Sequence, residues 1–470
     1  MIKEKVLLVI PPESSIKDDK QTESKWPRIG IAYLAAYLRK NEIRVKILDC
    51  KSLDLNHQDV AVKIREYNPD IIGLGPFTEE INEARKVCQT AKSINPNVIT
   101  IFGGPHASAL PQRTLEEFSE LDLVVCGEGE RTLTEIANGK DLSMIRGIAY
   151  RVYSQIIVNQ PAELIKDLDS LPFPAWDLFP LDSYRGRLSM HLREKIKKPI
   201  LELPILSARG CPFNCIFCYK AYPGLRNRNP INIIDEIEYN MKEYKATEFF
   251  FVEGTFAANR EQGIKICDEI INRGLNKKIK WMVETRVNVV TEELLEKMKQ
   301  AGCKQVDFGV ESGDEQILAN TKKGITINQV KKAVKLAKQA GLKVGCYFVI
   351  GHPFETEKTI KKTYRLAREL DPDLMNVGIM IPYPGTEVRR MAEAEEGNYH
   401  LVCEDWSEYT KQRGGPLELT NIPLKNLQKI QSREYLRYYI RPSKIPFILK
   451  HVPPKKMIKI IKSLLKVVFS

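Results

Sequence analysis

Three cysteines stand close together in the middle of the chain, at Cys211, Cys215 and Cys218, with the spacing C-x3-C-x2-C. Three thiolates on one short loop can converge on one metal centre, and soft sulfur ligands favour an iron–sulfur cluster or zinc. A four-iron cluster held by three cysteines keeps one iron open to an exogenous ligand. Zinc is the alternative, but no histidine lies nearby to complete it, the closest being His191. A disulfide is weaker still as an explanation.

Polar and glycine-containing segments follow the strands predicted around this loop. Apolar, β-branched runs predict strands at 201–206, 248–252, 280–283, 305–308, 343–350 and 374–379, with helical stretches between them. Six consecutive βα units form part of an eight-unit barrel, and active residues gather at the carboxyl ends of its strands. Those ends carry Glu253-Gly254, Arg286, Gly309-Val310-Glu311-Ser312-Gly313, Gly351-His352-Pro353 and Pro382-Tyr383-Pro384-Gly385-Thr386.

The cysteine loop and these ordered segments together resemble the radical S-adenosylmethionine (SAM) enzymes. The resemblance implies that Cys211, Cys215 and Cys218 hold a [4Fe-4S] cluster whose free iron binds SAM. It further implies that SAM is contacted by residues at the strand ends, with Glu253 and Gly254 at its amino group, Glu311 and Ser312 at its ribose and Phe217 beside its adenine. Arg286 and Gly351 complete the cofactor-binding positions that it implies.

Each of these side chains also has a simpler interpretation. Glu253 and Glu311 could be solvated loop carboxylates, and a glycine at a strand end often marks only a turn. Phe217 could pack in the core, and His352 could be an ordinary loop histidine. Their common placement at strand ends favours the cofactor interpretation.

The first 140 residues predict a second βα series. Buried strands are expected at 6–10, 45–49, 71–75, 98–103 and 123–125, with helices such as 29–40 and 79–93 between them. This pattern indicates a doubly wound parallel sheet with its ligand site at the carboxyl ends of the strands.

Three glycine-containing loops follow strands of this sheet, where glycine lets a bulky ligand approach the backbone. They are Gly75-Pro76-Phe77-Thr78, Gly103-Gly104-Pro105-His106 and Gly127-Glu128-Gly129-Glu130. No G-x-G-x-x-G segment opens the first helix, so a dinucleotide site is not favoured. The loops instead resemble the cobalamin-binding domain that precedes the radical SAM domain in one subgroup, which implies that they contact cobalamin. Glu128 and Glu130 could equally serve as favourable charges at the start of the next helix.

One departure from many cobalamin domains concerns the lower ligand of cobalt. Those domains carry Asp-x-His-x-x-Gly after the first strand, whereas residues 11–25 contain no histidine. The resemblance therefore implies a cobalamin bound without that axial histidine.

The predicted architecture is α/β. A Rossmann-like cobalamin-binding domain spans 1–164, and a proline-punctuated linker around Leu171-Pro172-Phe173-Pro174 spans 165–195. A partial (β/α)6 TIM-like barrel spans 196–395, and a helical C-terminal region with a basic tail spans 396–470.

The resemblance implies a function as well. An electron, supplied by a donor such as flavodoxin or ferredoxin, cleaves SAM to a 5′-deoxyadenosyl radical that takes hydrogen from an unactivated carbon. Methyl transfer from cobalamin is the favoured outcome. The subgroup also contains the anaerobic magnesium-protoporphyrin monomethyl ester cyclase, so a cyclase or oxidoreductase acting on a tetrapyrrole or lipid without methyl transfer is the alternative. A non-enzymatic cobalamin or iron–sulfur carrier or sensor is disfavoured, because it would not need an open iron.

The positive charge of the chain belongs to its C-terminal end. Residues 421–470 hold twelve basic residues and one acidic residue, so the first 420 residues carry only +1 of the net +12. Residues 454–470 place apolar and lysine side chains at helical spacing, which predicts a peripheral contact with an anionic membrane and makes a lipid or isoprenoid substrate more plausible. A helix packed on the barrel is the alternative. Nucleic acid is disfavoured, because no aromatic platform accompanies the charge.

Composition sets the remaining expectations. Hydrophobic residues make up 43% of the chain and charged residues 28%, as in globular proteins. The sequence contains neither an uncharged apolar run of membrane-spanning length nor a signal-peptide layout. The ten cysteines are scattered except for the group at 211–218, which is far from a disulfide scaffold. Together these features predict a cytoplasmic protein, placed at the inner face of the membrane if the tail binds there.

Overall fold

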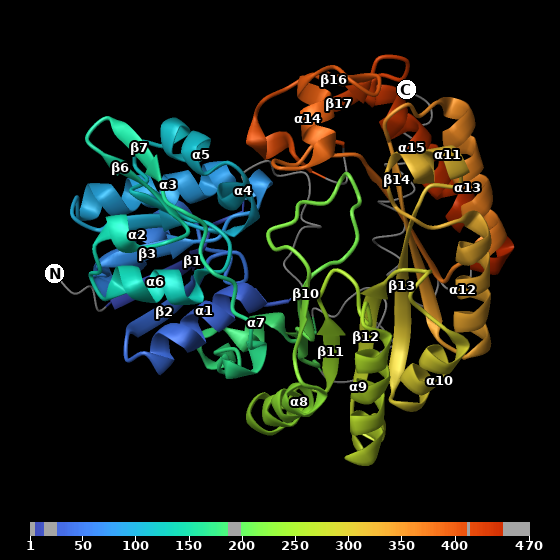
Figure 1. The fold of residues 1–470 in the computed structure, drawn as a ribbon, viewed down its shortest axis with the longest axis horizontal. Helices are drawn as coiled ribbons and strands as arrows, with labels where there is room; N and C mark the ends of the chain where they lie inside the picture. Colours follow the sequence, from blue (N-terminus) through green and yellow to red (C-terminus); the bar gives the residue numbers. More distant parts are fainter. Residues whose placement is uncertain (1–4, 14–25, 187–198, 411–413, 445–470) are drawn as a thin grey trace.

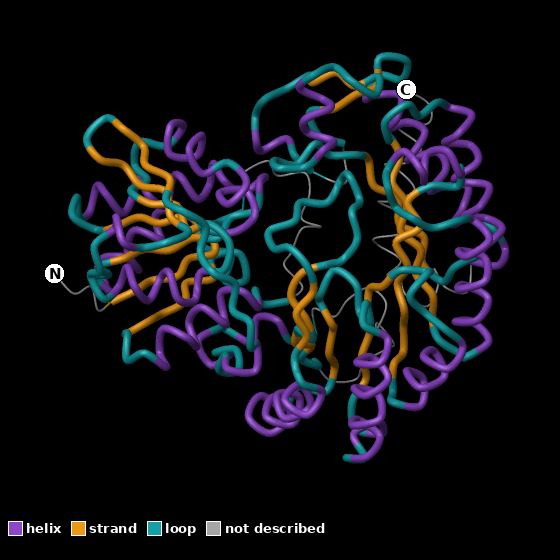
Figure 2. The backbone as a smooth tube through the Cα atoms, in the orientation of Figure 1, coloured by secondary structure: helices purple, strands orange, loops and turns teal. Residues whose placement is uncertain are grey.

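The structure, a computed structural model, describes residues 5–13, 26–186, 199–410 and 414–444. Its first half forms one sheet with helices on both faces, and its second half forms an arc of strands with helices on the outside (Figures 1 and 2). The C-terminal tail, the histidine His191 and most of the segment 11–25 lie outside the described residues.

The N-terminal sheet has seven strands in the order β2-β1-β3-β4-β5-β6-β7. The strands are β1 (Lys5–Ile10), β2 (Arg44–Asp49), β3 (Ile71–Leu74), β4 (Ile99–Phe102), β5 (Leu123–Val125), β6 (Ile148–Val152) and β7 (Gln155–Val158). The first five run parallel, and β6 and β7 extend the sheet antiparallel. The predicted doubly wound sheet is confirmed; the two antiparallel strands are an addition.

Both faces of this sheet are covered, which is why β1 reads as an unbroken apolar run. Val6, Leu8 and Ile10 join one buried cluster, and Leu7 and Val9 join another. The covering helices are α1 (Ile29–Lys40), α2 (His57–Tyr67), α3 (Ile81–Ile94), α4 (Gly104–Ala109), α5 (Pro111–Glu117) and α6 (Gly129–Ala137). Because β1 lies between β2 and β3, the strand order reverses at β1 and β3, the place where open α/β sheets bind ligands.

The second sheet has six parallel strands in the order β8-β11-β12-β13-β14-β15. They are β8 (Glu202–Ile205), β11 (Glu248–Phe251), β12 (Lys280–Thr285), β13 (Cys303–Glu311), β14 (Lys343–Ile350) and β15 (Leu374–Ile379). The helices are α8 (Pro230–Tyr244), α9 (Arg260–Asn272), α10 (Glu292–Gln300), α11 (Glu315–Asn320), α12 (Ile327–Gln339) and α13 (Glu357–Leu370). They lie along the outside of the arc (Figure 2), so the predicted partial barrel is confirmed.

A short antiparallel ribbon carries the cysteine loop. It consists of β9 (Ala208–Gly210) and β10 (Leu225–Asn227), and residues 211–224 connect the two strands. Gly210 has a φ of +88°, and a Cβ there would lie 2.2 Å from the carbonyl oxygen of Gly224. Only glycine fits at the base of this loop, directly before Cys211.

The C-terminal region closes the free edge of the barrel. It contains α14 (Glu387–Glu393), β16 (Tyr399–Leu401), β17 (Leu417–Leu419) and α15 (Leu424–Tyr439). The side chains of Gln431, Tyr435 and Tyr439, one helical turn apart on α15, bond the backbone of β15. Tyr435 Oη accepts from the N–H of Val377 at 2.6 Å, and Gln431 donates to the carbonyl oxygen of Val377 at 2.6 Å. These bonds satisfy an edge strand that would otherwise be open to pairing.

In its described part, residues 165–186, the proline-rich segment between the two sheets forms only short helical turns. They are η3 (Leu168–Ser170), η4 (Trp176–Leu178) and the four-residue α7 (Leu181–Tyr184). Trp176 and Tyr184 are buried, so the segment packs between the two halves. Among the described residues, no helix is long and apolar enough to cross a membrane.

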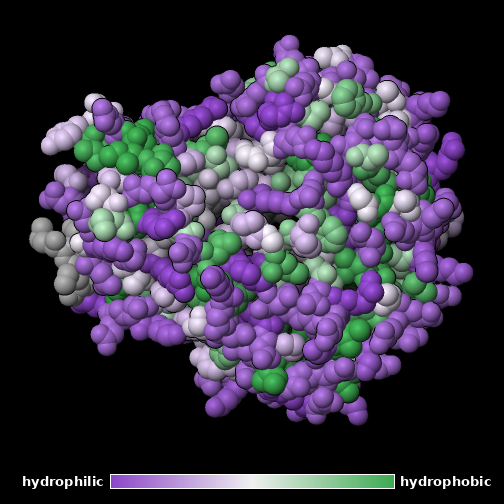
Figure 3. Space-filling view, viewed as in Figure 1, coloured by the Kyte–Doolittle hydropathy of each residue, from purple (hydrophilic) through white to green (hydrophobic). Residues whose placement is uncertain are grey.

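The surface shows two contrasting regions. Exposed apolar side chains gather on the β6–β7 hairpin, where Tyr153 is 96% exposed and Val158 50%, and they coincide with a green area in Figure 3. The outer helices of the barrel are predominantly hydrophilic in the same view.

Candidate functional site

Positive charge surrounds the cysteine loop. Arg286, just after β12, donates from Nη1 to Cys215 Sγ at 3.3 Å, and its guanidinium lies 3.8 Å from the ring centroid of Phe213. Its other nitrogen bonds the carbonyl oxygen of Lys323. These contacts place the predicted Arg286 against the loop, where it offsets negative charge on the sulfur atoms.

The three thiols differ in environment. A hydrogen bond from Cys218, together with the nearby cations Lys323 and Arg286, lowers the pKa of Cys215 to about 6 despite its burial. The same bond raises the pKa of Cys218. Cys211 Sγ lies 3.8 Å from Thr255 Oγ1. Within the described part of the chain, no three potential metal ligands are already arranged around a common point. Three soft sulfur donors on one loop beside two cations nonetheless fit a cluster with thiolate ligands.

Glu253 follows β11 and is buried beside the ribbon. It accepts hydrogen bonds from the Ser207 hydroxyl at 2.5 Å and from the Ser207 N–H at 3.3 Å. Burial raises the pKa of Glu253 to about 7, although these hydrogen bonds act in the opposite direction. Beside it, the position that a Cβ of Gly254 would take has no atom within 4 Å. A buried acceptor next to open space can receive an amino group.

Glu311 ends β13 in a strained conformation with a φ of +67°. Its carboxylate pairs with Lys323 at 2.6 Å, and a side chain at Gly309 would collide with both groups. Lys323 also lies 5.8 Å from the ring centroid of Phe217. The structure thus brings Glu311 and Phe217 together around a lysine.

The remaining predicted positions of the barrel are Ser312, after β13, and Gly351 and His352, after β14. Ser312 is fully buried, and its hydroxyl lies 3.3 Å from that of Thr363 on α13, so packing engages it. The N–H of Gly351 donates to Glu355 at 2.6 Å. His352 is also fully buried, 6.2 Å from Phe217 between ring centroids, and burial lowers its pKa to about 4. This histidine is therefore neutral at physiological pH.

The N-terminal loops converge at the carboxyl ends of β3, β4 and β5. Gly104 has a φ of +80°, and a Cβ there would lie 3.5 Å from the backbone of Gly75 and Pro76. The N–H of Gly127, where φ is +81°, donates to Ser108 Oγ at 3.0 Å. A Cβ at Gly75 or Gly127 would meet no atom within 4 Å, so the backbone there is accessible to a ligand.

The side chains of these loops are engaged differently. Phe77 is 48% exposed, with the Arg28 guanidinium 4.8 Å from its ring centroid. His106 is 2% exposed, 3.3 Å from Thr78 Oγ1, and its ring packs edge-on against Trp406. Burial lowers the pKa of His106 to about 4. Packing of this kind leaves His106 poorly placed to bind a metal.

Glu128 and Glu130 are turned toward the barrel. Glu128 pairs with Arg209 at 2.7 Å and with Arg226 at 2.9 Å, and Glu130 pairs with Arg209 at 2.5 Å. The prediction that their carboxylates contact cobalamin therefore meets a competing set of partners. The alternative of charges at a helix start fits their position at the first turn of α6, but it does not include these arginines.

Several residues of the site were not predicted from the sequence. Arg209 and Arg226 lie in the ribbon, and Lys323 joins Glu311 to the cysteine loop. Trp406 docks the C-terminal region on the N-terminal half, donating from Nε1 to Glu117 at 2.8 Å. Arg209 directly precedes Gly210-Cys211, and that adjacency is the one sequence signal among them.

The fold and site define the class of protein: a two-part α/β protein whose cysteine loop lies at the junction of a doubly wound sheet and a partial barrel. Comparison with known families agrees. The Radical SAM superfamily matches residues 205–367, and the B12 binding domain matches residues 20–137.

Two curated relatives match most of the chain. An uncharacterized methyltransferase of Pyrococcus horikoshii is 35% identical over 93% of this chain and 93% of its own length. The anaerobic magnesium-protoporphyrin IX monomethyl ester cyclase of Rubrivivax gelatinosus is 32% identical over 77% of this chain and 66% of its own.

A solved structure shares the fold. The cobalamin-dependent SAM radical enzyme OxsB, with aqua-cobalamin and SAM bound, has a TM-score of 0.73 at 18% identity and covers 99% of this chain and 71% of its own. The chain belongs to the radical SAM superfamily, among the members that also carry a B12-binding domain. It is an enzyme whose cofactors are a [4Fe-4S] cluster, SAM and cobalamin.

Proposed function

We propose that the enzyme transfers a methyl group to an unactivated carbon of a small molecule. The observation that carries this proposal is the direct contact between the cysteine loop's ribbon and the predicted cobalamin loop, through Arg209 and Glu128. The name of the Pyrococcus horikoshii relative, a methyltransferase, supports it. Residues 1–164 would bind cobalamin, 165–195 would link the two parts, 196–395 would bind cluster and SAM, and 396–470 would form the helical C-terminal region with the basic tail.

The barrel residues divide the work of binding. Cys211, Cys215 and Cys218 would hold the cluster, and Arg286 and Lys323 would balance its charge. The Glu253 carboxylate would accept from the SAM amino group, with Gly254 leaving the space for it. Glu311 and Phe217 would border the nucleoside, and neutral His352 adds no charge there. Ser312, bonded within the packing, would hold the turn after β13.

The N-terminal loops would offer backbone to cobalamin. Gly75, Gly104 and Gly127 provide close approach, and Pro76, Phe77, Thr78, Gly103, Pro105, His106 and Gly129 shape the loops. When bound, the cluster and SAM supply radical chemistry and cobalamin supplies a methyl carrier. The chain positions them and excludes water where the two halves meet. A flavodoxin or ferredoxin would supply the electron.

The test follows the methyl group without knowledge of the substrate. Anaerobically reconstituted enzyme is incubated with cobalamin, a chemical reductant and SAM carrying a trideuteromethyl group. Label recovered in the extracted cobalamin fraction is the expected result, and Cys215→Ala should abolish the release of 5′-deoxyadenosine. Release of 5′-deoxyadenosine with unlabelled cobalamin would overturn methyl transfer and favour the cyclase-type alternative, the activity named for the Rubrivivax gelatinosus relative.

We also propose that the enzyme touches an anionic membrane and acts on a lipid or isoprenoid there. The support is the basic C-terminal sequence together with α15, where Lys425, Lys429, Arg433 and Arg437 are exposed. Basic residues near an anionic surface each contribute about 1 kcal/mol.

Deletion of residues 451–470 should therefore remove most binding to vesicles containing phosphatidylglycerol. Co-sedimentation measures it, neutral phosphatidylcholine vesicles serve as the control, and circular dichroism verifies the fold. A folded, truncated protein that binds as well as the full chain would contradict the proposal.

A further inference from the structure

The ribbon that carries the cysteine loop is fastened to the N-terminal half by arginines at both of its strands. Arg209 on β9 and Arg226 on β10 face each other in the ribbon's register. Arg209 stands two residues before Cys211, and Arg226 follows the end of the loop. Both ends of the loop are therefore held through these two side chains.

Two carboxylates of the N-terminal half receive them. The Arg209 guanidinium spans both acids, with Nη1 at 2.7 Å from Glu128 and Nη2 at 2.5 Å from Glu130. Arg226 reaches the second oxygen of Glu128 at 2.9 Å, and the N–H of Ile165 donates to that oxygen at 2.7 Å. The side chains are 3–14% exposed. Because this cluster of charges is buried, its partners must stay in register.

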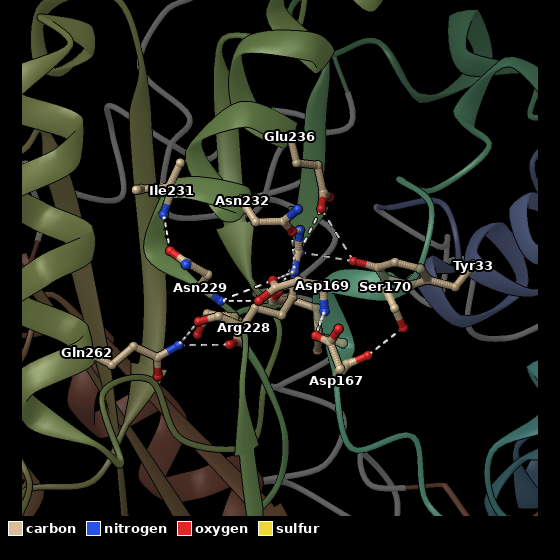
Figure 4. Close-up of polar contacts among 12 residues, drawn as sticks. Tyr33, Asp167, Asp169, Ser170, Arg228, Asn229, Ile231, Asn232, Glu236 and Gln262 are labelled. Carbon is tan, nitrogen blue, oxygen red and sulfur yellow. Dashed lines mark hydrogen bonds and ion pairs between the residues drawn. The ribbon is translucent and has the colours of Figure 1, made fainter.

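A second joint, drawn in Figure 4, also connects the ribbon to the N-terminal half. Arg228, just after β10, pairs with Glu236 at 2.6 Å and donates to the hydroxyl of Tyr33, on α1, at 3.0 Å. Gln262 donates to the carbonyl of Arg228 at 2.8 Å and to that of Ser207 at 3.1 Å. Ser207 in turn bonds Glu253. The same ribbon thus connects the N-terminal half to the predicted SAM contact.

The position of the first joint, between Arg209 and Glu128, is informative about function. Glu128 follows Gly127 in a loop predicted to contact cobalamin, and Arg209 precedes the loop predicted to hold the cluster. A short chain of contacts therefore joins the two cofactor loops directly. Apolar residues could have packed the same interface at similar or lower energetic cost, whereas paired charges also define one alignment.

We propose that Arg209 and Arg226 are positioning residues that fix the cluster-binding loop relative to cobalamin by pairing with Glu128 and Glu130. This inference rests on the proposed function. It gives Glu128 and Glu130 the task of aligning the two cofactors, in place of contacting cobalamin with their carboxylates.

The test is a double-mutant cycle of Arg209→Gln and Glu130→Gln in the full chain loaded with cluster and cobalamin. The direct readout is the magnetic coupling between cob(II)alamin and the reduced cluster, measured by electron paramagnetic resonance power saturation. Each single variant should lose most of this coupling while keeping its iron and its cobalamin affinity, and release of 5′-deoxyadenosine should fall about tenfold or more from misplacement. The double variant should be no worse than the poorer single, because Arg209→Gln already removes the contact that Glu130→Gln breaks.

Two controls separate alignment from general damage. Asp177→Asn breaks the exposed pair with Arg39 at 2.6 Å and should leave the coupling unchanged. Arg209→Lys keeps the positive charge but lacks the two-pronged guanidinium, so it should retain part of the magnetic coupling. It replaces Arg209→Gln in the test if that variant does not fold.

The possible failures are distinguishable. Loss of cobalamin affinity in Glu130→Gln but not in Arg209→Gln would show that the carboxylate contacts cobalamin and would overturn the proposal. Coupling equal to wild type in every variant would overturn it too. A wild-type protein that takes up neither iron nor cobalamin would refute the proposed function itself.

Discussion

Replacing Cys215 with alanine is expected to remove the iron–sulfur cluster and abolish cleavage of SAM. The wild-type protein, reconstituted without oxygen, should contain about four irons per chain, the content of a [4Fe-4S] cluster. Cys215 is the buried central thiol of the loop, held against Arg286 at 3.3 Å. With only two thiols left, the loop lacks one of the three proposed protein ligands of the cluster. Iron analysis and the visible spectrum measure the loss, and release of 5′-deoxyadenosine reports cleavage.

Cys403→Ala is the matched control for this variant. Cys403 has an intermediate exposure like that of Cys211, but it lies outside the cysteine loop. The Cys403→Ala variant should retain the full iron content and the full activity. Zinc in place of iron in the wild-type protein would contradict the assignment, as would equal iron in the Cys215 variant.

The strands that were predicted well are those buried on both faces. In β1, β3 and β11 every side chain but that of Lys5 is buried, so each reads in the sequence as a short apolar run, preceded by Lys5 in β1 and by Glu248 in β11. Strands β6 and β7 were missed because their outer residues face solvent, and β7 has no fully buried side chain. Their pattern resembles that of a loop.

The site was predictable as far as topology decides it. Parallel strands bring their carboxyl ends to one edge, so loops on neighbouring strands could be grouped from the sequence. The contacts that a side chain makes across an interface could not be predicted in this way. Glu130 pairs with Arg209, which is 79 residues away in the sequence, and no periodicity or spacing records that contact. The resemblance to a family drew attention to this loop but could not show where its carboxylates point.

The affinity for SAM is expected to rise about tenfold between pH 6 and pH 8, through loss of one proton from Glu253. Burial raises the pKa of this carboxyl to about 7. Below that pH the protonated group is a poor acceptor for an amino group, and above it the carboxylate accepts a charge-assisted hydrogen bond. Glu253→Gln should lose this part of the pH dependence and bind SAM about 10- to 100-fold more weakly at pH 8. Titration of SAM into the reconstituted enzyme, under conditions without turnover, measures both the affinity and its pH dependence. The amine of SAM adds its own pH dependence, which is the same for the wild type and the variant.

The same ionisation predicts an opposite trend in the stability of the ligand-free protein. Since the folded state raises the pKa of Glu253 from 4.5 to about 7, it binds more protons than the unfolded chain in that window. Stability therefore falls as pH rises from about 4.5 to 7, by up to roughly 3 kcal/mol, and Glu253→Gln should flatten this part of the denaturation profile.

Glu248→Gln separates the two effects. Glu248 begins the same strand, β11, and burial raises its pKa to about 7 as well, but it stands at the amino end, away from the predicted SAM site. Its variant should flatten the stability profile and leave the pH dependence of SAM binding intact. If Glu253→Gln behaved like Glu248→Gln in both measurements, Glu253 would be only a buried acid of the fold and would have no role in binding SAM. If Glu253→Gln alone removes the binding slope, the raised pKa serves the ligand, because the carboxylate that is costly in the empty site is the acceptor that SAM requires.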